Sequence, residues 1–200
     1  MSDHVTQASL LSRVRDPQNQ SAWREFEAKY RDLLLCYAER RGLQPADAED
    51  VRQQVMVNLS RYLRDFKYDP ARGRFRSYLG RMVRNGVAQI MTRRKIGEVA
   101  LDTSVKAAVP GKDEAETDDV WEDEWMKHHY RTAMIAIRQR VEPQTAAIFE
   151  RFVAGDSAEQ IAQAFDISNQ AVQKIKQRMR DRMKEQIALQ IRDEDEMPED

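Results

Sequence analysis

The sequence has little of what a disulfide, a sheet or a membrane span needs. Its 200 residues include only 1 Cys, 7 Gly and 6 Pro. The lone Cys36 excludes an internal disulfide, and the apolar residues around it predict a buried helix position. No apolar run approaches the roughly 20 residues that span a bilayer, and the N-terminus has no apolar signal core. Because β-branched runs are also rare, we expect an all-α, cytoplasmic protein without membrane insertion.

The net charge of −1 hides a segregation of charge along the chain. Residues 21–97 carry 17 Lys/Arg against 9 Asp/Glu, whereas residues 98–126 carry 2 against 10. Residues 127–190 carry 11 against 7, and the last ten carry 1 against 6. Basic modules attract polyanions, and an acidic segment is repelled by DNA. We therefore expect small helical domains at 1–97 and 127–190, an acidic flexible linker at 98–126 and an acidic tail at 191–200.

Three amphipathic helices are expected in the first domain. Apolar residues recur at steps of three and four over 23–37, again over 51–66, and again from Phe75 to about residue 95. In the second of these helices, Tyr62 falls in the apolar stripe. The stretch 67–74 between the second and third helices is rich in turn-forming and basic residues, which indicates a loop.

The second domain has the pattern of a helix-turn-helix. Helices are expected at about 120–140 and 143–152, and the segment 157–178 then has a short helix, a turn and a longer helix. Asp166 lies where the turn needs a left-handed backbone, and Ser168 is placed to cap the second helix. The outward face of that helix offers amide and ammonium groups, which hydrogen-bond base edges and phosphates in a major groove. This pattern points to DNA binding.

Two motifs in the first domain add a second signal. Residues 47–55 read Asp-Ala-Glu-Asp-Val-Arg-Gln-Gln-Val, and residues 75–79 read Phe-Arg-Ser-Tyr-Leu, followed by the pair Arg84-Asn85. They resemble the Asp-Ala-Glu-Asp-Leu-Val-Gln-Glu-Val signature, the Phe-Arg-x-Trp-Leu motif and the Arg-Asn pair in region two of bacterial RNA polymerase sigma factors. The resemblance is to the compact extracytoplasmic-function (ECF) type.

The second domain is similar to region four of the same family, through the helix that begins at Glu142-Pro143 and through the helix-turn-helix. The resemblance covers nearly all of residues 21–187. It implies RNA polymerase core (β′ clamp and β flap) and promoter DNA as partners, an anti-sigma factor as a further partner, and no cofactor and no catalytic residue. The acidic linker would imitate nucleic acid in the RNA-exit channel of the polymerase.

The resemblance also implies three sets of site residues. The set for the polymerase clamp is Asp47, Glu49, Asp50, Gln53 and Gln54, although the acidic members could instead serve only the helix N-terminus. The set for the minus-ten element is Tyr68, Arg72, Arg74, Phe75, Tyr78, Arg81, Arg84, Asn85, Gln89, Arg93 and Arg94, with a packed core position as the alternative for Tyr78. The set for the minus-thirty-five element is Ser168, Asn169, Gln170, Gln173, Lys174, Lys176, Gln177 and Arg178.

Two rival functions use other features of the sequence. A polymerase-independent repressor or activator would use the same helix-turn-helix and would bind a palindrome without polymerase. An enzyme would need a metal site at His128-His129 with the nearby carboxylates of residues 122–124. Adjacent histidines point to opposite sides of a helix, and no second set of ligands follows at helical spacing. We therefore expect these histidines to lie on the surface and the protein not to be an enzyme.

Overall fold

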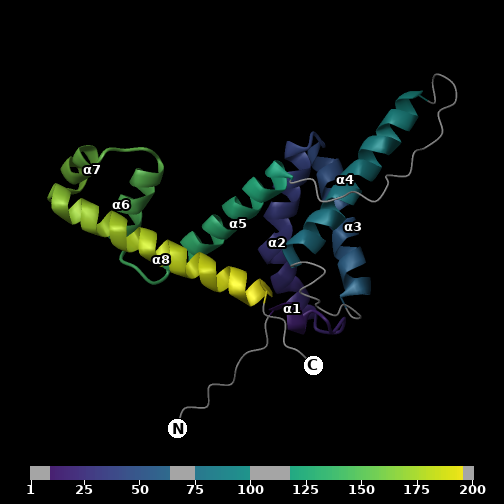
Figure 1. Ribbon diagram of the computed structural model, residues 1–200, viewed down its shortest axis with the longest axis horizontal. Coiled ribbons are helices and arrows are strands. Elements are labelled where there is room, and N and C mark those ends of the chain that lie inside the picture. The colour runs from purple at the N-terminus through teal and green to yellow at the C-terminus, as the bar shows by residue number, and fades with distance from the viewer. Residues whose placement is uncertain (1–9, 64–74, 100–117, 196–200) are drawn as a thin grey trace, which may run out of the picture. The chain divides into compact units, whose positions relative to one another are not determined.

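The computed structural model describes residues 10–63, 75–99 and 118–195, and within these ranges it contains helices and no strand (Figure 1). The all-α expectation is confirmed. No helix in this part of the chain is both long and apolar enough to cross a bilayer. The helices are α1 (Leu10–Arg13), α2 (Gln20–Arg40), α3 (Pro45–Tyr62), α4 (Phe75–Val99), α5 (Asp119–Arg138), α6 (Pro143–Val153), α7 (Ala158–Phe165) and α8 (Asn169–Asp195).

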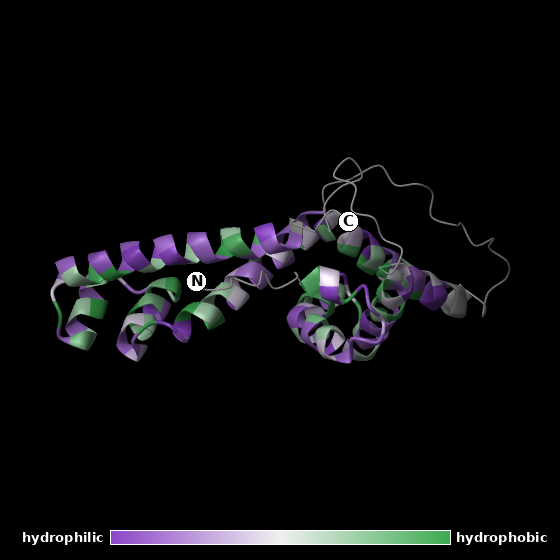
Figure 2. Ribbon diagram, turned by 90° about the horizontal axis from the view of Figure 1, so that it is seen from below, coloured by the Kyte–Doolittle hydropathy of each residue, from purple (hydrophilic) through white to green (hydrophobic). Residues whose placement is uncertain are grey.

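The chain divides into two compact units. The front unit comprises Met1–Met126 together with Asp193–Asp200, and the back unit comprises Lys127–Arg192. Helices α5 and α8 therefore contribute residues to both units. Hydrophobic and hydrophilic residues alternate along the helices, as expected where each helix buries one face (Figure 2).

An aromatic cluster anchors the core of the front unit. The ring of Phe26 on α2 lies 4.6 Å from that of Tyr30 and 6.0 Å from that of Phe75 on α4. All three side chains are at most 1% exposed. Leu59 on α3 and Leu63, which follows the last residue of α3, are buried, whereas Tyr62 is 60% exposed. The predicted inward position of Tyr62 is therefore wrong, because the helical phase that buries Leu59 and Leu63 turns Tyr62 outward.

The end of the predicted linker is a structured part of the front unit. Helix α5 begins at Asp119, and Trp121 and Trp125 are each 3% exposed in the front core. Residues 119–126 are thus helical, which agrees with the helix expected from about residue 120, and the flexible linker expected at 98–126 does not extend through them. Each tryptophan buries a large apolar area, and that gain outweighs the acidic composition on which the linker prediction was based.

The predicted acidic tail also begins as helix. Helix α8 continues to Asp195, and Glu194 is only 4% exposed. The Glu194 carboxylate accepts a hydrogen bond of 2.7 Å from the Tyr30 hydroxyl and lies 2.9 Å from the Lys29 ammonium group. Burial, together with this carboxylate, raises the pKa of Tyr30. These partners explain why an acidic residue is buried there.

In the back unit, the predicted helix-turn-helix is confirmed in local detail. The Ser157 hydroxyl accepts from the Gln160 backbone N–H at 3.2 Å, and the Gln160 side chain accepts from the Ser157 backbone N–H at 2.8 Å, so α7 begins with a capping box. Asp166 has φ 52° and ψ 50°, the left-handed conformation expected for the turn. The Ser168 hydroxyl then accepts from the Ala171 backbone N–H at 3.1 Å and caps α8.

The two histidines of α5 are buried, and the prediction that they lie on the surface is wrong. His128 is 3% and His129 0% exposed. His129 shares the inner face of α5 with Ala133 and Ile137, and its Nδ1 atom lies 3.0 Å from the Gln190 carboxamide on α8. In the described ranges, no three or more His, Cys, Asp or Glu side chains gather as a metal site would require.

Candidate nucleic-acid and polymerase interfaces

The acidic residues of the Asp-Ala-Glu-Asp motif differ in what they contact. Asp47 forms an ion pair with Arg94 on α4. Glu49 lies 2.6 Å from Arg52 and 3.6 Å from Arg31. Asp50 is exposed and, within the described ranges, forms no ion pair. Of the three carboxylates predicted to bind the polymerase clamp, Asp50 is therefore the one left available to a partner.

Arg52 ties α3 to α2 beneath this motif. It is only 8% exposed, and its guanidinium donates to Glu49 and to Glu27 on α2. Hydrogen bonding from Arg52, opposed by partial desolvation, holds the pKa of Glu49 below its ordinary value. In the sigma-factor signature that residues 47–55 resemble, the residue at position 52 is an apolar Val. Here the same inward position holds a cation, which fixes Glu49 within the domain.

An exposed stripe on α3 continues from Asp50. Gln53 lies one turn further along and is exposed, and Val57 follows with 48% of its side chain exposed. Val57 was not among the predicted contact residues. It could have been identified from its spacing, because it lies four residues after Gln53, on the face opposite the buried Val55 and Leu59.

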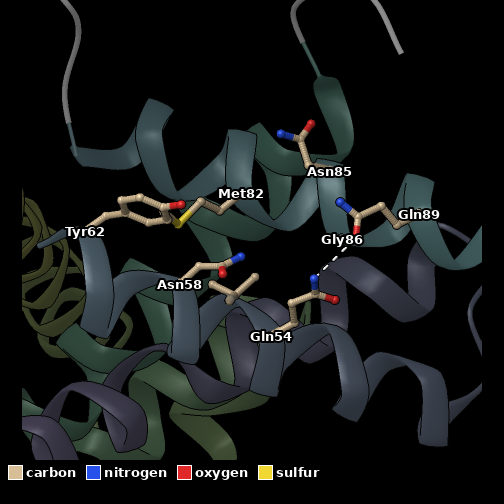
Figure 3. Close-up of a pocket in the computed structure, with 8 residues that line it drawn as sticks. Gln54, Asn58, Tyr62, Met82, Asn85, Gly86 and Gln89 are labelled. Carbon is tan, nitrogen blue, oxygen red and sulfur yellow. Dashed lines mark hydrogen bonds between the residues drawn. The ribbon is translucent and has the colours of Figure 1, made fainter. Parts of the chain in front are cut away.

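A cavity of about 210 Å³ lies between α3 and α4, and half of its eight lining residues carry a carboxamide, so we call it the carboxamide cavity (Figure 3). The Gln54 side chain donates to the Gln89 carboxamide oxygen at 3.3 Å across it. Gly86 lets the helices approach, because a Cβ there would lie 3.0 Å from Val51. The residues lining the cavity are Gln54, Val55, Asn58, Tyr62, Met82, Asn85, Gly86 and Gln89.

This cavity brings together residues that the sequence assigned to different partners. Gln54 was predicted to contact the polymerase, whereas Asn85 and Gln89 were predicted to contact DNA. Asn58 and Tyr62 were missed. They lie one and two turns beyond Gln54, and this i, i+4, i+8 spacing could have identified them.

The other residues predicted to contact the minus-ten element differ in how exposed they are. Arg81 and Arg93 are exposed, whereas Arg84 is 36% exposed and lies 3.8 Å from Asp118. Phe75, predicted to lie beside DNA, is instead 1% exposed in the aromatic cluster, so it is closed to a base. Tyr78 is half-buried, and burial raises its pKa. Tyr68, Arg72 and Arg74 lie outside the described residues.

The outer face of α8 is polar, cationic and open. All eight residues predicted to read the minus-thirty-five element are exposed. Lys176 lies with its ammonium group 4.6 Å from the centre of the Phe152 ring, on the side of α6. The Gln177 amide donates to both Asp181 carboxylate oxygens at 3.0 Å, and Arg180 donates to the Gln177 oxygen at 2.7 Å. Gln177 is thus held by its own helix.

Part of the front unit matches a known protein family. Residues 28–95 match the family model described as Sigma-70 region 2, a range that includes both front motifs and the carboxamide cavity. The solved structure titled "Structure of CnrH in complex with the cytosolic domain of CnrY" is similar at 20% identity and a TM-score of 0.35, over 90% of this chain and 96% of that chain. No curated protein matches. Residues 28–95 are therefore a sigma-70 region 2 domain, which confirms the resemblance to bacterial sigma factors found in the sequence.

Proposed function

We propose that this protein is an ECF-type sigma factor that binds RNA polymerase core and directs it to promoters. One observation carries the proposal: a single chain holds a sigma-70 region 2 domain and a helix-turn-helix with a cationic, amide-rich outer face. The polymerase would perform nucleotidyl transfer, so the protein itself acts without catalysis or a cofactor. It works in the cytoplasm, on the nucleoid.

The carboxamide cavity is the place where we expect the front unit to read the minus-ten element. Its lining is neutral, which suits an uncharged base better than a phosphate. Amide groups can pair with base edges, and the exposed ring of Tyr62 at its side can stack on a base that has left the duplex. Arg81 and Arg93, which are exposed on α4, would contact phosphates of the strand.

The first turns of α8 would read the minus-thirty-five element in the major groove. In helix-turn-helix proteins the N-terminal residues of the second helix contact base edges. Asn169, Gln170 and Gln173 occupy those turns and are exposed. Lys174 and Arg178 follow on the same helix and suit phosphate contacts. The back unit would also meet the β flap of the polymerase.

The exposed stripe of Asp50, Gln53 and Val57 on α3 is the surface that we expect to dock on the β′ clamp. It combines one unpaired carboxylate, one amide and one exposed apolar side chain, the mixture found at specific protein interfaces. An anti-sigma factor that covers this stripe would compete with the polymerase.

Run-off transcription with purified bacterial core polymerase on a library of promoter fragments tests the proposal. We expect specific transcripts only when the protein is present. Asp50→Ala should abolish core binding, and Asn85→Ala should preserve core binding but reduce open-complex formation. Asp32→Ala, which changes an exposed carboxylate on α2, is the matched control.

A different result would reassign the protein. Failure to bind core and to produce transcripts, together with tight binding of a palindromic duplex by the protein alone, would establish the polymerase-independent repressor or activator instead. The same helix-turn-helix serves both functions, so core binding is the deciding measurement.

A further inference from the structure

Residues 118–125 form an acidic, tryptophan-containing segment that lies on an arginine-rich face of the front unit, and we call this segment the cover. All of its contacts described below lie within the front unit. Four of its carboxylates meet three arginines of α2 and α4. The pairs are Asp118 with Arg84 at 3.8 Å, Glu122 with Arg76, Asp123 with Arg40, and Glu124 with Arg40 at 2.7 Å.

Trp121 seats the cover on Gly80 of α4. A Cβ at position 80 would lie 2.7 Å from the Trp121 Nε1 atom and 2.8 Å from its Cε2 atom, so a larger residue would displace the indole. The Trp121 ring also meets the Tyr37 ring edge-on at 5.5 Å, and the Tyr37 hydroxyl donates to Asp118. Trp121 can make this close contact with Gly80 only when the cover is docked.

Trp125 provides the second anchor. Its ring stacks on Tyr30 with a centroid distance of 6.4 Å, and the Arg76 guanidinium lies 5.6 Å from its centre. Arg76 is therefore held twice by the cover, once by Trp125 and once by Glu122. Both contacts compete with a phosphate for its guanidinium.

Two observations indicate that the cover can be displaced. The Trp121 indole N–H is buried and finds no hydrogen-bond acceptor in the described part of the chain, which is a cost of the docked state. Two of the four ion pairs remain open to water, since the side chains of Glu122 and Asp123 are 47% and 46% exposed, whereas those of Asp118 and Glu124 are 9% and 3% exposed. Exposed ion pairs are weak and exchange readily with other anions.

The cover carries only negative charge, and the face beneath it carries arginines. From 118 to 124 the sequence has five Asp or Glu residues and no Lys or Arg. Phosphates along a nucleic-acid strand offer the same charge to the same guanidinium groups. Arg84 also precedes Asn85, which lines the carboxamide cavity, so the covered face adjoins the proposed base site.

We propose that residues 118–125 are a displaceable cover, and that their docking and the binding of DNA phosphates to Arg76 and Arg84 exclude each other. The choice of DNA as the polyanion rests on the proposed function. When DNA engages the front unit, the two arginines pass from the cover to the strand. Free protein therefore presents a smaller cationic surface than DNA-bound protein.

Two readouts on the full-length chain test the cover. In a Trp23→Phe background, Trp121 and Trp125 are the remaining tryptophans, so their emission reports whether the cover is docked. A labelled oligo(dT) strand should shift this emission to longer wavelength as it binds. Gly80→Leu should show the shifted emission without DNA. Its affinity for the strand should exceed that of the parent at the same salt concentration, because no docked cover has to be displaced before the two arginines reach the phosphates.

Matched variants separate the cover from general charge effects. Adding Arg76→Ala and Arg84→Ala to Gly80→Leu should abolish this gain in affinity and make the salt dependence of binding shallower, by a slope of about 1.4, because each phosphate neutralised in a single strand contributes about 0.7. If Gly80→Leu does not fold, as judged by circular dichroism, Asp118→Asn/Glu122→Gln replaces it and should loosen the cover with little change of shape. Its control is Asp32→Asn/Glu39→Gln, which removes the same charge from exposed positions on α2 and should leave tryptophan emission unchanged.

The proposal is overturned if DNA binds without moving the tryptophan emission, or if the undocked variants bind the strand no more tightly than the parent. Run-off transcription judges the proposed function separately. A protein that transcribes normally while its tryptophans stay buried on DNA would retain its proposed function and lose the cover.

Discussion

The first turns of α8 in the back unit leave most of their outer polar side chains open to solvent, whereas α3 and α4 in the front unit tie many of their polar side chains to one another. The outer positions from Ser168, which caps α8, to Arg178 are exposed, and of these Gln177 is held by Asp181 and Arg180. On α3 and α4, by contrast, Asp47 is paired with Arg94 and Gln54 with Gln89. A surface that is already open suits a regular duplex. A surface whose groups must first exchange partners suits a strand that is itself rearranging.

The largest effect that we expect comes from Phe75→Ala, which tests whether the front unit depends on its core at a position the sequence assigned to DNA. Removing this buried ring should lower the free energy of unfolding of the front unit by about 3–5 kcal/mol. Urea unfolding monitored by circular dichroism measures the loss. Ser77→Ala, at an exposed neighbouring position, should leave the unfolding midpoint unchanged. An unchanged midpoint for Phe75→Ala would contradict the buried position.

In the back unit, Gln173→Ala should act directly, because its side chain is open and no partner must be released first. Loss of a base contact should weaken binding to the preferred minus-thirty-five duplex by about 1–3 kcal/mol and relax the preference at one base pair. Lys174→Ala is the comparison, because loss of a phosphate contact should weaken all duplexes alike and lower the salt slope by about 1. Equal effects on all duplexes for both variants would show that Gln173 does not read a base.

Ser168→Ala tests whether the open face depends on the cap of α8. The Ser168 hydroxyl accepts from the Ala171 backbone N–H, and loss of such a cap costs about 1 kcal/mol. Thermal unfolding should show a small decrease for Ser168→Ala and a much smaller one for Ser168→Asp, which restores a cap. If the aspartate variant loses as much stability as the alanine variant, the cap is not the cause.

The two units also differed in how far the sequence could predict them. The helix-turn-helix depends on signals a few residues apart, such as Ser157 with Gln160 and the turn at Asp166, and these were readable. The carboxamide cavity joins Gln54 to Gln89, 35 residues further along, and depends on the relative phase of two helices. No local pattern reports that phase.

Average composition misled the prediction at two other places. The linker boundary at residue 126 was set by acidic composition, although the apolar spacing already predicted a helix from about residue 120, and Trp121 and Trp125 are buried in the front core there. His129 was judged by its polarity, whereas its spacing from Ala133 and Ile137 places it on the buried face of α5. In both cases helical phase carried more information than residue class.

The smallest effect that we expect is the response of the cover to acid, and it would sharpen the contrast between a tied front unit and an open back unit. Burial alone would raise the pKa of Asp118. Hydrogen bonds from Tyr37 and the Trp121 backbone N–H, with the charges of Arg41 and Arg84, together hold it below the ordinary value. Because the pKa is lower when the cover is docked, the contribution of Asp118 to docking is present above about pH 4 and is lost as the pH falls through the docked pKa.

Tryptophan emission of the Trp23→Phe protein, followed from neutral pH downwards, measures this response. The emission should stay constant above about pH 5 and move to longer wavelength below about pH 4. The other carboxylates of the cover that form ion pairs with the front unit are Glu122, which faces Arg76, and Asp123 and Glu124, which face Arg40. Asp118→Asn isolates its share: the variant should start with part of the shift at neutral pH and respond less to acid. If the variant and the parent respond identically, Asp118 does not hold the cover, and the tryptophans alone keep the front unit closed.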